Sequence, residues 1–203
     1  MDELKQIANY ILLHGRYQRN IGLFHGKAGI MLTMFLFSQK TGISVYHDFA
    51  EDLFDDVQNQ LYDNMPIGME NGLAGIAYAM SYLANKNILS FDQNEILSDI
   101  DNKIMSVDPR RITDLSFNTG ALGIWIYINE RMKCKEVLTS IDGQYIGELK
   151  DILKEGYSSN TSEFNLLERL QKPTFSIHEY EKQKLDIDEG VAYYLLKYSL
   201  THD

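Results

Sequence analysis

Apolar residues recur along this chain at helical intervals, in two kinds of segment that alternate. In the first kind, apolar residues form one stripe and leave acids and lysines on the opposite side, as in an outer helix. In the second kind, almost every position is apolar, as in a helix buried on all sides. Period-2 alternation is scarce, so the sequence predicts an all-α protein. The outer segments lie at about 4–12, 49–61, 96–104 and 146–153, and the inner ones at 30–37, 76–83, 124–128 and 193–198.

A glycine motif precedes each inner segment. It reads Gly22-Leu-Phe-His-Gly-Lys-Ala-Gly-Ile30 in the first copy, and it recurs at 68–76 and, in a more divergent form, at 116–124. A fourth, weaker copy begins at Gly190, where Gly190-Val-Ala-Tyr193 aligns with Gly75-Ile-Ala-Tyr78. The glycines of this structural motif are Gly22, Gly26, Gly29, Gly68, Gly72, Gly75, Gly120, Gly123 and Gly190.

The repeating unit is therefore an outer helix, a glycine cluster and an inner helix, present four times. Hairpins of this kind bury their inner faces against their neighbours and form an arc or a ring. We expect one domain over 1–203, with an insertion or irregular segment within 156–186. The last inner helix has no following hairpin, so either that insertion or a second copy of the chain should cover it. The sequence thus predicts a homodimer as one solution.

Composition and charge narrow the classes of function. The formal net charge of −10 leaves no basic surplus for nucleic acid, and no apolar run reaches the roughly 18 residues that span a bilayer. The N-terminus lacks the basic start and apolar stretch of a secretory signal. A single cysteine, Cys134, excludes an internal disulfide framework and predicts a cytoplasmic protein. It also excludes a metal site that needs two protein thiolates.

The motifs at 22–30 and 68–76 resemble those of the lanthionine synthetase C family, and the resemblance extends over about 7–200. It implies an α/α toroid of about seven hairpins around a central cavity, of which this chain has four and so forms a partial, open ring. It also implies an enzyme that adds a peptide cysteine to a dehydrated serine or threonine, on a zinc ion held by two cysteines and a histidine.

The chain departs from that family at the zinc ligands. Asn71, Thr119 and Glu189 stand at motif positions where the cysteines would be, and Cys134 follows the end of an inner segment. A catalytic zinc needs three converging protein ligands. We therefore expect no zinc cyclase, no cofactor and no catalytic residue carried over from the family. A harder metal remains an alternative, with carboxylate ligands from Glu70, Asp114, Asp186 and Asp188.

Polar residues at the heads of the inner helices are the candidates for binding. His25 matches the histidine of the family motif, and it can serve as an acid, a base or a hydrogen-bond donor. The alternative is that His25, Asn71 and Thr119 only cap the inner helix or the neighbouring loop. The predicted set, at the mouth of the cavity, is His25, Glu70, Asn71, Asp114, Asn118, Asp188 and Glu189.

The favoured function is a cyclase-like accessory that binds a peptide, or a peptide-modifying enzyme, during peptide maturation. Two alternatives stay open. One is a helical interaction scaffold without a cavity role. The other is a metal-free hydrolase that uses two carboxylates, for which Glu70 and Glu189 are the candidates.

Overall fold

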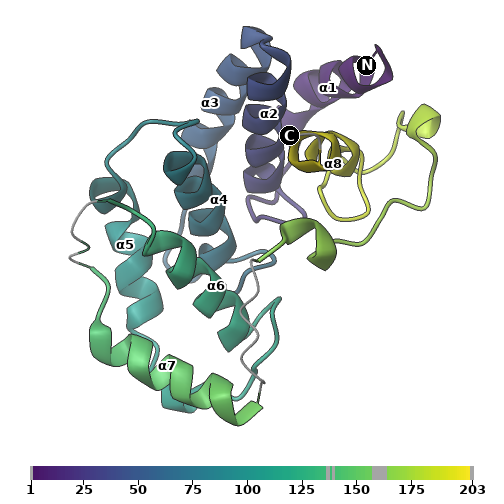
Figure 1. Ribbon diagram of the computed structural model, residues 1–203. Helices are drawn as coiled ribbons and strands as arrows, with labels where there is room; N and C mark the ends of the chain where they lie inside the picture. The colour runs from purple at the N-terminus through teal and green to yellow at the C-terminus, as the bar shows by residue number, and fades with distance from the viewer. Residues whose placement is uncertain (1, 136–137, 139, 157–163, 202–203) are drawn as a thin grey trace. The chain divides into compact units, whose positions relative to one another are not determined.

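The computed structural model describes residues 2–135, 138, 140–156 and 164–201 of the chain (Figure 1). These residues form α-helices, 3-10 turns and loops, with no β-strand among them, so the predicted all-α class is confirmed. The elements are α1 Asp2–His14, η1 Gly15–Tyr17, α2 Lys27–Thr41, α3 Ser44–Asn59, α4 Leu73–Asn85, α5 Gln93–Met105, η2 Pro109–Arg111, α6 Ala121–Arg131, α7 Gly143–Gly156, η3 Leu166–Arg169, η4 Ile177–Glu179 and α8 Ala192–Thr201.

The alternation of amphipathic and apolar helices follows the sequence pattern. In α2 every residue from Lys27 to Ser38 is buried, whereas the amphipathic α3 buries one side only. The other even-numbered helices are the remaining inner segments, and α1, α5 and α7 are the remaining outer ones. None of the described helices combines the length and the apolar character that crossing a bilayer requires.

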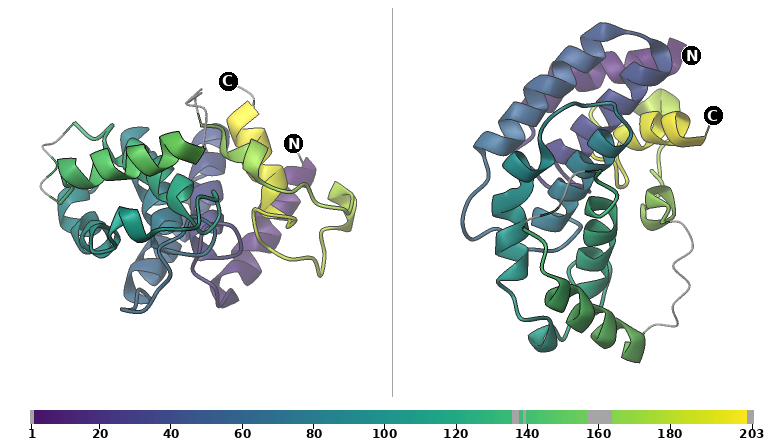
Figure 2. Two further views of the ribbon diagram at one scale, coloured as in Figure 1. Left: turned by 90° about the horizontal axis from the view of Figure 1, so that it is seen from below. Right: turned by 60° about the vertical axis from the view of Figure 1, so that its left-hand side comes forward.

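The chain divides into two compact units, which we describe separately. The terminal unit comprises Met1–Asp63 and Asn165–Asp203, and the central unit comprises Asn64–Phe164. In the terminal unit α2 packs against α3 and α8, and α8 also contacts α1 (Figure 2). In the central unit α4 packs against α5 and α6, and α6 contacts α7. The single domain and the open ring that the sequence suggested stay predictions.

The glycine loops before the inner helices close with the same backbone hydrogen bond in each of the four copies. The amide that follows the loop glycine donates to the carbonyl seven residues earlier in the chain. This common geometry confirms the repeat. The bonds run from Lys27 N to Asn20 O at 2.9 Å, from Leu73 N to Pro66 O at 2.9 Å, from Ala121 N to Asp114 O at 2.9 Å and from Val191 N to Lys184 O at 2.8 Å.

These bonds make Gly190 the equivalent of Gly26, Gly72 and Gly120. The sequence alignment of Gly190 with Gly75 was therefore wrong by three residues. A glycine is needed at position 190 for a steric reason, because a Cβ there would lie 2.3 Å from Asp186 O, inside the tight loop. Tyr193 consequently takes the place of the third motif glycine, which is Gly29 in the first copy.

Neighbouring repeats are joined by a second recurring bond. Glu70 N donates to Asn118 O at 2.9 Å in the central unit, and Asp188 N donates to Phe24 O at 3.3 Å in the terminal unit. All four residues stand two positions before their loop glycine. The fourth repeat is therefore joined to the first in the way that the second is joined to the third. This contact, with the packing of α8 on α1 and α2, covers a face of α8 that the sequence left without a neighbour.

In the segment that the sequence assigned to an insertion, 156–186, Gly156 ends α7 and the description resumes at 164. From 164 to 186 it contains only the 3-10 turns η3 and η4 between loops. Residues 157–163 of the predicted insertion lie outside the described residues. Tyr194 of α8 donates a hydrogen bond to Phe175 O at 2.5 Å, which ties this segment to the last inner helix.

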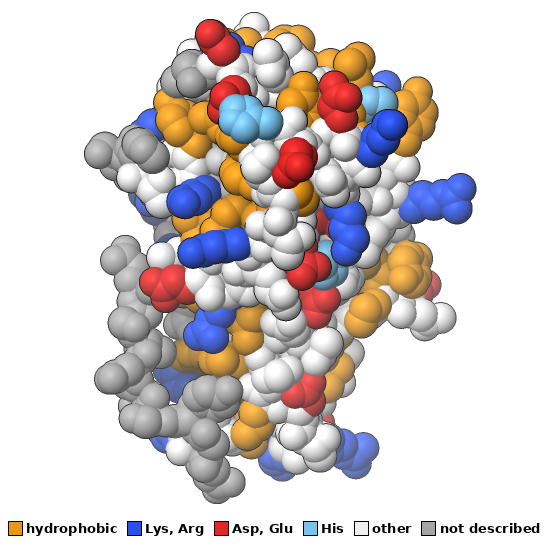
Figure 3. Space-filling model, turned by 90° about the vertical axis from the view of Figure 1, so that its right-hand side faces the viewer, with side chains coloured by type: hydrophobic (Ala, Val, Ile, Leu, Met, Phe, Trp, Pro, Cys, Tyr) orange, Lys and Arg blue, Asp and Glu red, His pale blue; other side chains and the backbone are white. Residues whose placement is uncertain are grey.

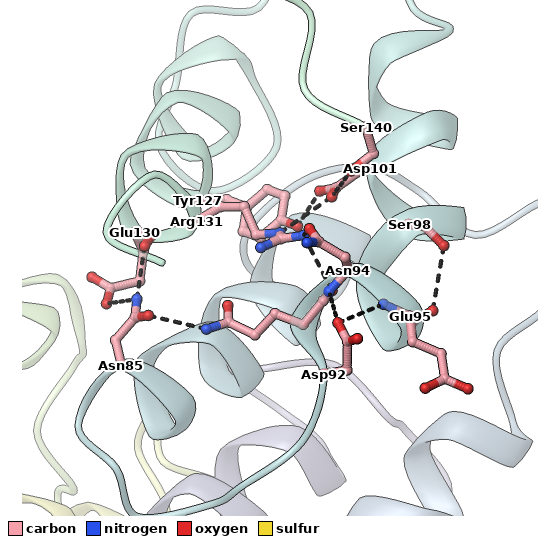
Figure 4. A network of polar contacts seen from close by, with 11 residues as sticks. Asn85, Asp92, Asn94, Glu95, Ser98, Asp101, Tyr127, Glu130, Arg131 and Ser140 are labelled. Atoms are coloured by element: carbon pink, nitrogen blue, oxygen red, sulfur yellow. Dashed lines mark hydrogen bonds and ion pairs between the residues drawn. The ribbon is translucent and has the colours of Figure 1, made fainter. Parts of the chain in front are cut away.

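A buried ion pair connects α5 with α6 in the central unit (Figure 4). Asp101 and Arg131 have no exposed side-chain surface, and Arg131 Nε lies 3.2 Å from Asp101 Oδ2. The Tyr127 hydroxyl donates to Asp101 Oδ1, and the Ser140 hydroxyl donates to Oδ2 at 2.5 Å. Burial, followed by the charge of Asp101, raises the pKa of Tyr127 well above its usual value, so the hydroxyl remains a donor.

Candidate functional site

In the terminal unit, a histidine of the first repeat faces two acids of the fourth. His25 Nδ1 lies 3.6 Å from Asp186 Oδ2, and His25 Nε2 lies 3.7 Å from Asp188 Oδ2. The imidazole is 28% exposed, whereas the two carboxylates are 8% and 10% exposed. Each ring nitrogen of His25 therefore lies beside a different carboxylate of the fourth repeat.

The two acids are held in place by polar groups from other segments. Gln18 Nε2 donates to Asp186 Oδ1 at 2.7 Å, and the Gln171 amide donates to Asp188 Oδ1 at 2.6 Å. Burial nevertheless raises the pKa of Asp186 above the usual carboxyl value, although His25, Lys184 and Gln18 act in the opposite direction. The ionised Asp186 side chain therefore carries a desolvation cost that its partners offset only in part.

Replacing Asp186 with asparagine tests this cost through its pH dependence. A carboxyl whose pKa is raised by folding stabilises the protein below its unfolded pKa, and it loses that contribution as the pH rises through its folded pKa. We therefore expect Asp186→Asn to gain stability relative to the wild type as the pH rises from about 3.8, the unperturbed value. Urea unfolding at a series of pH values measures the difference. Asp99→Asn, on the exposed side of α5, is the control, and a difference that falls with pH would contradict the assignment.

In the central unit, Glu70 stands at the motif position that Asp188 has in the terminal unit, two residues before the loop glycine. Its Oε1 accepts a hydrogen bond from Asn71 Nδ2 at 3.2 Å, and its Oε2 accepts one from Asn118 Nδ2 at 3.1 Å. These three side chains, with Thr119, line a surface hollow of about 330 Å³ beside the loop glycine Gly72. The site therefore presents a carboxylate whose two oxygens are oriented by side-chain amides, at the head of an inner helix.

Asp114 organises the loop next to this hollow. Its Oδ2 accepts a hydrogen bond from the Thr119 hydroxyl at 2.5 Å, and its Oδ1 accepts one from the Ser116 amide at 2.8 Å. The bond from Thr119, followed by those from Ser116, lowers the pKa of Asp114. Asp114 is thus an ionised loop residue that positions Thr119.

The polar residues directly before the loop glycines, at positions that we call the loop heads, are not themselves the N-cap residues of the inner helices. Gly26, Gly72 and Gly120 occupy the N-cap positions of α2, α4 and α6, and glycine has no side chain to make a capping hydrogen bond. The first free amides are instead satisfied by the loop carbonyls described above. The alternative in which His25, Asn71 and Thr119 cap the inner helix or the neighbouring loop stays a prediction.

The described residues do not form a metal centre. Residues 2–135, 138, 140–156 and 164–201 contain no group of three His, Cys, Asp or Glu side chains arranged to hold a metal ion. In the His25 cluster the two ring nitrogens face different carboxylates, so the three side chains do not converge on one point. This result gives no support to the alternative in which these carboxylates bind a hard metal ion.

Comparison with known families identifies the family of this chain. A family model described as "Lanthionine synthetase C-like protein" matches residues 17–173, more than three quarters of the chain. The chain belongs to the lanthionine synthetase C-like family. No curated protein and no solved structure matches it. The family match ends before the fourth glycine loop, so the fourth repeat rests on the backbone bond of Val191.

The zinc site of this family does not fit the residues present in this lanthionine synthetase C-like chain. At the loop heads, Asn71 offers an amide, Thr119 a hydroxyl and Glu189 a carboxylate. Two thiolates and an imidazole are required instead. Cys134 lies in the turn after α6, where its amide donates to Arg131 O at 3.1 Å. It is not at a loop head.

The structure brings the predicted residues together in two groups. Glu70, Asn71 and Asn118 surround the hollow of the central unit, with Asp114 in the adjoining loop, while His25 and Asp188 meet in the terminal unit. That all seven predicted residues line one cavity mouth stays a prediction.

Glu189 does not have the surroundings of Glu70, the acid with which the sequence analysis paired it as a hydrolase candidate. Its backbone has a φ of 58°, and its carboxylate lies 3.9 Å from Lys184 Nζ. Asp188, rather than Glu189, occupies the position equivalent to Glu70, two residues before the loop glycine. Glu70 and Glu189 also belong to different compact units. The two-carboxylate hydrolase therefore has no geometric support.

Sequence reasoning left three members of the site out of its predicted set. Asp186 was considered as a metal ligand, whereas Gln18 and Thr119 were not proposed as partners of the acids. The signal for Asp186 is its spacing, since it stands two residues before Asp188 in the loop before Gly190. Gln18 carries no such signal, because its contact with Asp186 depends on the meeting of the first and fourth repeats.

The surface around α8 does not display a field of one sign. On the face drawn in Figure 3, lysine and arginine side chains lie singly among acidic, histidine and hydrophobic side chains.

Proposed function

We propose that this lanthionine synthetase C-like protein binds a peptide, or an enzyme that modifies one, during peptide maturation, and that it does not act as a zinc-dependent cyclase. The observation that carries the proposal is the set of groups at the loop heads. Where the family's chemistry needs thiolates, this chain presents amides, a hydroxyl and carboxylates. Such groups bind a ligand without activating a thiol.

The hollow beside Glu70 supports a peptide as the ligand. Carboxylate and amide groups complement the amide N–H, hydroxyl and ammonium groups that peptides present. The Glu70 carboxylate is half-buried and held by Asn71 and Asn118, so little further ordering is needed when a ligand arrives. We place the main contact of the peptide at this hollow, with Glu70 as its acceptor.

Purification of the tagged chain from its native cells tests the proposal. We expect a dehydratable precursor peptide, or a peptide-modifying enzyme, to co-elute and to be identified by mass spectrometry. Glu70→Gln should lower its recovery by at least about tenfold, because a desolvated charged acceptor is replaced by a neutral amide. Glu95→Gln, an exposed glutamate on α5 of the same unit, should leave recovery unchanged.

Two results would overturn the proposal. One is stoichiometric zinc in the purified protein together with thioether formation, since both require the chemistry that the loop heads lack. The other is elution of the chain alone, or only as a homo-oligomer, whether Glu70 is present or replaced. Light scattering on the same fractions would report the oligomer directly.

A further inference from the structure

A groove in the terminal unit gathers apolar side chains that are open to solvent. It lies between the end of α1 with η1 on one side and α3 on the other, and its volume is about 440 Å³. Leu12, Leu13 and Tyr17 form one wall, and Val45 and Phe49 form the other. We call this surface the α1–α3 groove.

Most of the exposed large hydrophobic side chains among the described residues line the α1–α3 groove. Leu13 is 65% exposed, Tyr17 81% and Val45 48%, and all three line the groove. Among the described residues only two other large hydrophobic side chains are exposed, namely Tyr62 and Met132. Single exposed apolar residues are ordinary, but a group of them in one concave surface is typical of an interaction site.

An acidic ridge borders the groove along α3. Asp48, Glu51, Asp52 and Asp55 are all exposed, and their spacing places them along one side of the helix. Asp48 and Asp52 line the groove itself. Arg16 pairs with Asp52 and is the one basic residue among those lining it, so the ridge keeps a negative surplus.

We propose that the α1–α3 groove binds a cationic amphipathic segment of a peptide partner. Apolar side chains on one face of the segment enter between Tyr17 and Val45, and its lysines or arginines lie against the acidic ridge. This goes beyond the proposed function, because it names a second surface that includes none of the loop-head residues. The binding proposed for one surface can be wrong while the binding proposed for the other is correct.

Charge decides between this occupant and two others. A second copy of the chain would bring a net charge of −10 toward the acidic ridge, and an anionic lipid surface would be repelled in the same way. A cationic segment gains both the apolar contact and the opposite charge. It therefore fits the apolar walls and the acidic border together.

A designed peptide serves as the probe. A fluorescein-labelled leucine–lysine peptide of about 14 residues, roughly four helical turns, presents leucines on one face and lysines on the other. Its affinity for the full chain is measured by fluorescence anisotropy at several salt concentrations. A scrambled peptide of the same composition separates groove binding from general attraction to an acidic protein. A leucine–glutamate peptide tests the sign of the charge.

Matched variants test whether the peptide binds in the groove. Tyr17→Ser should weaken the leucine–lysine peptide by at least about tenfold, as expected for a central aromatic contact, whereas Tyr62→Ser should not. Asp48→Lys should weaken binding and reduce its salt dependence, whereas Asp99→Lys on α5 should change little. All four side chains are exposed, so circular dichroism should confirm an unchanged fold.

The outcomes separate this proposal from its rivals and from the proposed function. Equal binding of the scrambled peptide, or equal losses in Tyr17→Ser and Tyr62→Ser, would overturn it. A dimer seen by light scattering that dissociates in Tyr17→Ser would assign the groove to a second copy. Recovery of the partner with Glu70→Gln reports on the hollow, whereas binding of the designed peptide to Tyr17→Ser reports on the groove, so a failure at one surface is not read as a failure at the other.

Discussion

Replacing Arg131 with methionine should lower the free energy of unfolding by about 3–5 kcal/mol, because it leaves Asp101 buried without its counter-ion. Neither side chain of this pair is exposed. Arg131 also donates to Gln93 O at 3.1 Å and to Asn94 Oδ1 at 2.9 Å, so its loss removes the link between α6 and the start of α5. Trp125, on α6, provides a fluorescence probe of the central unit during urea unfolding.

Two further variants separate the cost of a buried charge from the loss of a large side chain. The double variant Asp101→Leu with Arg131→Met should recover much of the lost stability, since a buried pair can often be replaced by apolar residues. Arg111→Met, whose side chain is 87% exposed, should stay within about 0.5 kcal/mol of the wild type. A loss below about 1 kcal/mol in Arg131→Met would contradict the assigned role of the pair.

Adding a single methyl group at Gly29 should destabilise the terminal unit by about 3 kcal/mol or more. A Cβ at this position would lie 2.0 Å from Leu23 O, a backbone atom, and 3.1 Å from Ile187 Cγ1 of the fourth repeat. The loop cannot make room without moving its backbone at Leu23, and the Ile187 side chain of the fourth repeat must also shift. Hydrogen exchange of α2 and α8 measures the loss where it should occur.

The matched control for Gly29→Ala is the same substitution at Gly147. This glycine lies within α7 and is exposed, and a Cβ added there would meet no neighbouring group within 4 Å. Alanine has the higher helix propensity, so Gly147→Ala should stabilise the protein by up to about 1 kcal/mol. A neutral Gly29→Ala would show that the two repeats do not approach as closely as the structure places them.

The helices and the repeat were accessible from the sequence because both depend on local spacing. Apolar residues on every side of 30–37 predicted a buried helix, and α2 is buried along most of its length. The loop glycines recur because a tight loop excludes any Cβ, which leaves a signal in each copy. The fourth copy was aligned three residues away because it retains only the loop glycine and has Tyr193 where the third motif glycine would be.

Only part of the site could be predicted from the sequence. His25, Glu70 and Asn71 were found because they stand at fixed positions before a loop glycine. Their partners come from other repeats: Asp186 lies far from His25 in the chain, and Asn118 lies 48 residues from Glu70. Spacing within one motif carries no information about which repeat lies beside it.

The sequence by itself determined the helical class, the fourfold repeat, the family resemblance and the lack of thiolates for the family's zinc. Each of these follows from residue identity and short-range periodicity. Only the tertiary structure decided that the fourth repeat meets the first, that Asp186 and Asp188 flank His25, and that Arg131 is buried against Asp101. These contacts depend on which faces pack together, and that choice is made by the summed burial of many residues rather than by any one motif.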